Sequence, residues 1–101
     1  MQNLHNRARG EALIEIDGRP IRLCVTLGAL AELEASFDVV SLADLGERLA
    51  HLTAADLIVV LAALAKGGGD ALSGTELCSA RIDPKAAAIA VAKAFSLALD
   101  E

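Results

Sequence analysis

The residues of this chain that could do catalytic or metal chemistry are few and widely spaced. The 101-residue sequence holds two histidines, His5 and His51, and two cysteines, Cys24 and Cys78. No nucleophile, base and orienting residue can be grouped from them, and their spacing is not that of a metal site. His51 falls near the end of a predicted helix, where it complements the helix dipole. We therefore expect no enzyme, no metal and no cofactor, and two buried thiols of an intracellular protein.

Two further patterns could suggest a binding site, and both have a simpler interpretation. The glycines Gly67–Gly69 follow a predicted helix instead of a strand, without the Gly-Lys-Ser/Thr of a phosphate loop, so they predict a turn. Three acidic residues of one predicted strand, Glu11, Glu15 and Asp17, could meet Arg22 across a hairpin. This arrangement is typical of a solvated face.

One carboxylate, Glu34, lies where an apolar side chain is expected. In a helix over Leu27–Phe37 the apolar residues gather on one face at about 100° per residue, and Glu34 falls at the edge of that face. The first interpretation is an ion pair with Arg22 or Arg48, because burying an unpaired carboxylate is costly. The alternative is a polar residue that sets the register of a bound partner helix, as in coiled coils.

The composition is that of a small folded domain. Apolar residues make up 54% of the chain and charged residues 23%, with only two aromatic residues. The net charge of −5 disfavours nucleic acid as a partner, and no aromatic platform for stacking bases is present. We expect a flexible tail over residues 1–9, which carries Arg7 and Arg9, and a single domain over residues 10–101.

No stretch of the sequence predicts a targeting or membrane-spanning segment. The first residues lack the apolar region of a signal peptide. The longest apolar run, Leu57–Ala65, is far shorter than the roughly 20 residues that a membrane span requires. We expect a soluble cytoplasmic protein with no membrane partner.

Alternating apolar residues predict one β-hairpin near the N-terminus. In EALIEIDGRPIRLCV two alternating runs are separated by DGRP. Gly18 can adopt the positive φ of a tight turn, and Pro20 can begin the second strand. An isolated hairpin is marginal in water, so its apolar face must pack against helices.

Capping signals divide the rest of the chain into helices. Serine or threonine precedes most of the predicted starts, and Asp83 with Pro84 forms a strong start for the last helix. The predicted helices are Leu27–Phe37, Leu42–His51, Ala54–Lys66, Thr75–Ala80 and Pro84–Leu99. The predicted fold is α+β, an N-terminal β-hairpin followed by a bundle of four to five short α-helices.

Two of these helices carry more apolar surface than one face can bury. Ala54–Lys66 is apolar around its whole axis, and on Pro84–Leu99 two residues, Ile89 and Leu97, flank Lys93 opposite the main apolar face. A helix that is apolar all round must be covered all round. The surplus favours a homo-oligomer or another protein partner. The alternative is a tight, alanine-rich core that covers both helices.

The order of these signals resembles that of a known family. A short polar start, a strand, DGRP, a second strand and TLGALAELEASF are followed by TAADLIVVLAALAKGGG. The series is similar to the tail assembly chaperones of gene transfer agents and siphophage-like prophages, from about Gly10 to the glycine-rich turn. The resemblance implies a non-catalytic protein that binds the helical tape-measure protein, or other tail proteins, while a tail is built. Residues 72–101 carry no signature of that family.

The expected partner surface consists of four apolar residues, Val59, Ala63, Ile89 and Leu97. They would accept anchors spaced along a client helix. An alternative of another class is a structural tail component, either a tube or a connector subunit. Tube subunits need long strands, whereas this sequence predicts one short hairpin. A third possibility, a small ligand-binding domain, would need convergent polar groups that no pattern here indicates.

Overall fold

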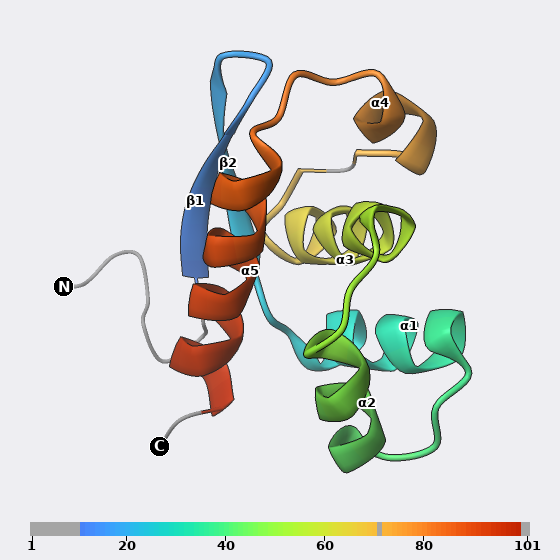
Figure 1. Ribbon diagram of the computed structural model, residues 1–101. Coiled ribbons are helices and arrows are strands. Elements are labelled where there is room, and N and C mark those ends of the chain that lie inside the picture. Colours follow the sequence, from blue (N-terminus) through green and yellow to red (C-terminus); the bar gives the residue numbers. More distant parts are fainter. Residues whose placement is uncertain (1–10, 71, 100–101) are drawn as a thin grey trace, which may run out of the picture.

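A computed structural model describes residues 11–70 and 72–99 of the chain. Within these residues two strands are followed by five helices (Figure 1). They are β1 (Glu11–Ile16), β2 (Arg19–Cys24), α1 (Leu27–Phe37), α2 (Leu42–Leu49), α3 (Ala54–Gly67), α4 (Gly74–Cys78) and α5 (Pro84–Leu99). The predicted α+β fold is confirmed. The expected tail over residues 1–9 lies outside the described residues.

The two strands form an antiparallel sheet that is closed by a two-residue turn. Asp17 and Gly18 both have positive φ, 54° and 78°, as a type I′ turn requires. Alternate side chains of both strands are buried on one face, whereas Leu13 points to the other side and is exposed. The buried face consists of Ala12, Ile14, Ile16, Ile21 and Leu23.

Four helices begin at the serine or threonine that the sequence predicts. The hydroxyl of Thr26 accepts a hydrogen bond from the Ala29 N–H at 3.0 Å at the start of α1. Ser41 caps α2 in the same way, and α3 and α4 begin with reciprocal capping boxes. Such caps satisfy N–H groups that the first turn leaves without a partner. The starts of these four helices are therefore determined by the residues next to them in the sequence.

The predicted bounds are correct for α1 and α5, and the other three helices differ slightly. α3 extends one residue further, to Gly67, and α4 begins one residue earlier, at Gly74. α2 and α4 each end two residues earlier than expected. After each of these ends the backbone N–H donates to the carbonyl three residues back, from Ala50 in one case and from Ala80 in the other. This tighter pattern ends the α-helical turn.

α3 is the central helix of the molecule. It packs against β2, α1, α4 and α5, and in Figure 1 it lies between α4 and α1. Its buried residues include Val60, Leu61, Ala63, Leu64 and Ala65. The apolar character all round α3 is therefore explained by the core, which is the alternative that the sequence left open for this helix.

The glycines after α3 end the helix and also allow it to approach the sheet. Gly69 has φ 100°, its N–H donates to the Lys66 carbonyl, and Asp70 donates to the Ala65 carbonyl, which together form a Schellman motif. A Cβ atom on Gly67 or Gly68 would collide with backbone carbonyl oxygens of β2. The predicted turn is confirmed, but only one of the three glycines is required by a positive φ.

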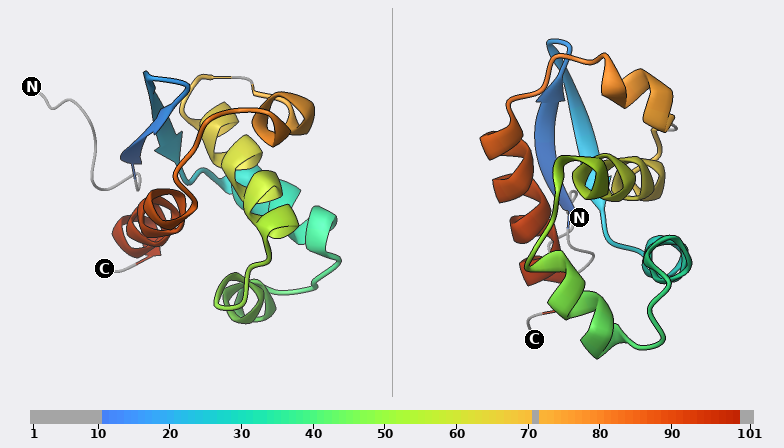
Figure 2. Two further views of the ribbon diagram at one scale, coloured as in Figure 1. Left: turned by 45° about the horizontal axis from the view of Figure 1, so that its top comes forward. Right: turned by 45° about the vertical axis from the view of Figure 1, so that its right-hand side comes forward.

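α5 lies beside β1 and also contacts β2 and α3 (Figures 1 and 2). The side of α5 that faces the core consists of small apolar residues and the ring of Phe95. Ala87, Ala90, Val91, Ala94 and Phe95 are buried there. Its other side is not fully covered, since Ile89 remains 62% exposed.

Candidate partner-binding site

A groove of about 800 Å³ lies between β1 and α5. The residues of α5 that line it recur three or four positions apart, so one stripe of the helix faces the groove. The lining consists of Glu11, Ala12, Leu13, Arg22, Ala86, Ile89, Ala90, Lys93 and Leu97. The groove is thus built from elements at opposite ends of the described chain.

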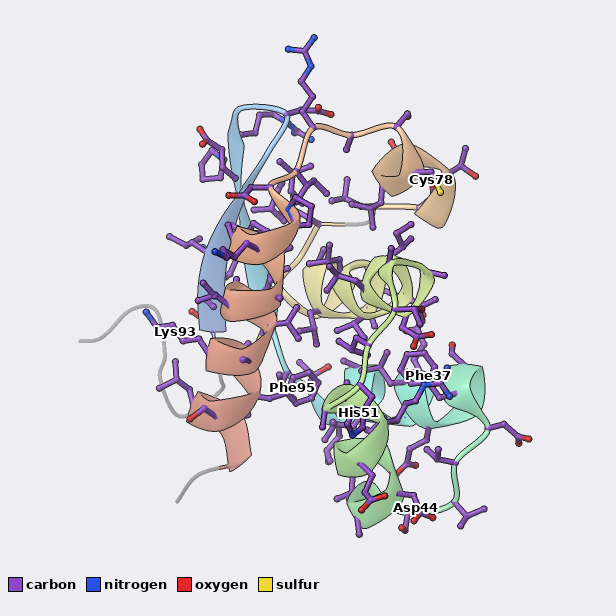
Figure 3. All side chains as sticks on the ribbon, in the orientation of Figure 1. Phe37, Asp44, His51, Cys78, Lys93 and Phe95 are labelled. Atoms are coloured by element: carbon purple, nitrogen blue, oxygen red, sulfur yellow. The ribbon has the colours of Figure 1, made fainter. Side chains whose placement is uncertain are left out.

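Two large apolar side chains of the groove are open to solvent. Leu13 is 69% exposed and Ile89 is 62% exposed. Figure 3 shows that Lys93 points outward from α5, whereas Phe95 points toward the other helices. Exposed apolar side chains that share one concave surface are typical of a protein contact site. The stripe on α5 therefore forms the apolar wall of a candidate partner-binding site.

The structure separates the four predicted partner-binding residues. Ile89 and Leu97 both line the β1–α5 groove. Val59 is half-buried on α3, and Ala63 is only 2% exposed. The expectation that Ala63 lies on the surface is wrong, because α3 is covered by its neighbours. A partner role for Val59, Ile89 and Leu97 remains a prediction.

Leu13 and Arg22 are among the groove residues that the sequence did not assign to the partner surface. Leu13 lies directly across the hairpin from Arg22. The available signal was the alternation of β1, in which Leu13 is the one large apolar residue at a position that points away from the core. Arg22 was considered only as a partner for acidic residues.

A bidentate ion pair joins α2 to the start of α3. The Arg48 guanidinium donates to both oxygens of Asp56, from Nη2 at 2.9 Å and from Nε at 3.3 Å. The same guanidinium lies over the Phe37 ring, 4.6 Å from its centroid. Asp56 also accepts the Thr53 N–H within the capping box. Three helices are therefore tied together at one point.

These hydrogen bonds shift the pKa values of both Asp56 and Arg48. The bond from Arg48, followed by the backbone bond from Thr53, holds the pKa of Asp56 below its ordinary value. The pKa of Arg48 is raised, chiefly by the same hydrogen bond. Because the Asp56 side chain is only 11% exposed, the pair is less screened than most surface ion pairs.

The expected ion pair of Glu34 is not formed. Arg48 is paired with Asp56 instead, and within residues 11–70 and 72–99 the half-buried Glu34 side chain has no ion-pair partner. Its backbone carbonyl accepts the Val39 N–H at 3.0 Å, where the chain leaves α1. The pairing prediction is therefore wrong. The alternative, a register-setting role toward a partner, stays a prediction.

The acidic face predicted for the hairpin is only partly solvated. Glu15 and Asp17 are exposed, but Glu11 is 6% exposed and is buried in the groove. Asp17 has a structural role, because its carboxylate accepts the Arg81 N–H at 2.7 Å and its own N–H donates to the Arg81 carbonyl. These bonds tie the hairpin turn to the loop before α5.

The cysteines and the described histidine occupy separate places. Cys24 is buried as expected, whereas Cys78 is exposed on α4, so the prediction of two buried thiols is wrong for Cys78. His51 is exposed after α2. Across the described ranges no group of three or more metal-ligating side chains comes together. Of the helices in those ranges, none is long and apolar enough to cross a membrane.

Comparison with known proteins gives one match. A family model described as "Phage tail tube protein, GTA-gp10" matches residues 9–100 of the chain. No curated protein matches the sequence, and no solved structure does. The match covers both strands and all the described helices, including α5, for which the resemblance seen in the sequence carried no signature.

Proposed function

Because the chain belongs to the phage tail tube family described as GTA-gp10, we propose that it is a structural component of a phage-like tail, either a tube or a connector subunit. The match over residues 9–100 is the observation that carries this proposal. A role in phage-type tails agrees with the resemblance seen in the sequence. The family is a structural one, and the absence of catalysis remains a prediction.

The β1–α5 groove supports a role that depends on contacts between proteins. It exposes apolar side chains on a strand and on a helix, as a subunit contact requires. We expect its partners to be other tail proteins or further copies of this chain. Synthesis in the cytoplasm of a bacterial host is part of the proposal.

A second candidate function is a tail assembly chaperone that binds the tape-measure protein transiently. The observation that favours it is the length of the strands, since β1 and β2 have six residues each. A tube wall built of strands needs longer ones. The description of the family favours the structural role, so the chaperone role is the second of the two.

Deletion of the gene tests the shared part of both proposals. We expect particles without tails, or with malformed tails, when the host culture is viewed by electron microscopy. Complementation with the wild-type gene should restore tails. Normal tails in the deletion strain would contradict any role in tail building.

Co-expression tests the chaperone role separately. The candidate tape-measure protein from the same gene cluster would be expressed with and without this chain, followed by size-exclusion chromatography. A structural subunit should leave the solubility of the tape-measure protein unchanged. A tape-measure protein that is soluble only in the presence of this chain, and elutes with it, would favour the chaperone role instead.

A further inference from the structure

The exposed apolar side chains of this protein fall into two groups. Among the described residues five large apolar side chains are exposed. Two of them, Leu13 and Ile89, line the β1–α5 groove. The other three, Leu27, Val40 and Leu42, lie on α1, in the loop after it and at the start of α2. Exposed apolar side chains among the described residues therefore occur in two separate regions, the groove and the stretch from α1 to the start of α2.

The two surfaces differ in charge. The groove is lined by two cations, Arg22 and Lys93, and by one buried carboxylate, Glu11, so its lining has a net charge of +1. Residues 27–51, here called the α1–α2 segment, contain five carboxylates and one cation, Arg48, which gives −4. The carboxylates are Glu32, Glu34, Asp38, Asp44 and Glu47. Most of the net charge of −5 is thus on this segment.

The two surfaces face different directions. In Figure 3, Lys93 points away from the flank of α5, while Asp44 lies at the far end of α2, on the other side of the molecule. They cannot meet within one molecule. Contact between two grooves, or between two α1–α2 segments, would bring like charges together. Contact between a groove and the α1–α2 segment of another copy pairs opposite charges and covers apolar side chains on both.

We propose that the β1–α5 groove of one copy binds the α1–α2 segment of a second copy, head to tail. Such a contact is heterologous, because each copy uses two different surfaces. A chain of these contacts closes into a ring or continues as a filament. The inference rests on the proposed structural role, since a tail subunit is present in many copies.

Charge reversal on each surface gives a direct test with the full chain. Lys93→Glu changes the groove, and Glu47→Lys changes the α1–α2 segment; both side chains are exposed, so the fold should persist. By sedimentation velocity over a range of concentrations, wild type should self-associate, and each variant should do so about tenfold more weakly. Circular dichroism would check that both variants are folded.

An equimolar mixture of the two variants is the sharpest part of this test. In the mixture, the groove changed by Lys93→Glu can bind the segment changed by Glu47→Lys, because the charges of both are reversed. The wild-type groove of the Glu47→Lys variant can likewise bind the wild-type segment of the Lys93→Glu variant. We expect association to recover in the mixture although each variant alone has lost it. Lys85→Glu is the matched control, since Lys85 is exposed on α5 but does not line the groove.

Two results would overturn the head-to-tail contact. One is a wild-type chain that stays monomeric at every concentration. The other is self-association that both reversals leave unchanged. If the deletion strain nevertheless lacks normal tails, the proposed function stands and only this contact is wrong.

Discussion

At the residue scale, the most informative group is the ion pair of Arg48 and Asp56, with the Arg48 guanidinium over the Phe37 ring. It joins residues eight positions apart on two helices, and no local pattern indicates it. The sequence suggested Arg22 or Arg48 as a partner for Glu34 instead, because Glu34 falls at the edge of the apolar face of its helix. Only the placement of α2 relative to the start of α3 in the folded chain decides which carboxylate the guanidinium reaches.

This pair predicts acid sensitivity. The pKa of Asp56 is lowered in the folded protein, so its contribution to the free energy of unfolding is complete above its ordinary pKa of about 3.9. This contribution is lost as the pH falls through the lowered pKa that Asp56 has in the folded protein. We therefore expect the free energy of unfolding, measured with denaturant, to fall from neutral to acidic pH. In the Asp56→Asn variant this free energy should be lower at neutral pH and should fall less on acidification.

A double-mutant cycle would show that the pair acts as a unit. Arg48→Gln should lower the midpoint of denaturant unfolding at neutral pH, as Asp56→Asn does. The double variant should be less destabilised than the sum of the two changes, because each change alone already breaks the pair. Additive effects would mean that the two residues act independently.

At the element scale, the approach of α3 to β2 depends on glycine. Gly68→Ala places a Cβ atom against the Arg22 carbonyl, 2.8 Å from its carbon, so the helix end or the strand must shift. We expect a loss of about 1–3 kcal/mol in the free energy of unfolding. Gly46→Ala is the control within α2, where nothing lies within 4 Å, and should stabilise by about 0.5–1 kcal/mol. Equal effects of the two changes would contradict the close approach.

The contrast between α3 and α5 gives a second prediction at this scale. Leu64 is fully buried in α3, so Leu64→Ala should cost about 2–5 kcal/mol of unfolding free energy, measured by denaturant titration. Ile89→Ala on α5 should change it by less than about 0.5 kcal/mol, because that side chain is exposed. A large loss for Ile89→Ala would mean that the residue supports the fold and is not a contact residue.

The elements were predictable where their causes are local. Thr26, Thr53 and Ser73 each cap the helix that follows, and the Asp17–Gly18 turn follows from two residues that tolerate positive φ. The role of Gly68 was not predictable, because the clash it avoids is with a strand more than forty residues earlier in the chain.

At the scale of the whole molecule, the sequence predicted surplus apolar surface but could not place it. Ala63 and Ile89 both lie on the back face of an apolar helix, yet one is 2% and the other 62% exposed. The difference comes from tertiary packing, since α3 is surrounded and α5 lies at one flank. Half of the predicted site, Ile89 and Leu97, therefore lies in the groove.

The groove needed long-range information for the same reason. Its strand β1 and its helix α5 are separated by almost seventy residues, so Leu13 and Ile89 could not be joined from the sequence. Charge showed a similar limit. The net charge of −5 is visible in the composition. That the acidic α1–α2 segment lies away from the groove is visible only in the folded structure.

The most direct test of a structural role in the tail is the protein composition of purified particles. Quantitative mass spectrometry would measure copies of this chain per particle against a known capsid or tail protein. We expect the chain to be present in many copies, in a multiple that fits a ring. Complete, tailed particles that lack the chain would contradict it, and together with tailless particles from the deletion strain would favour the transient chaperone.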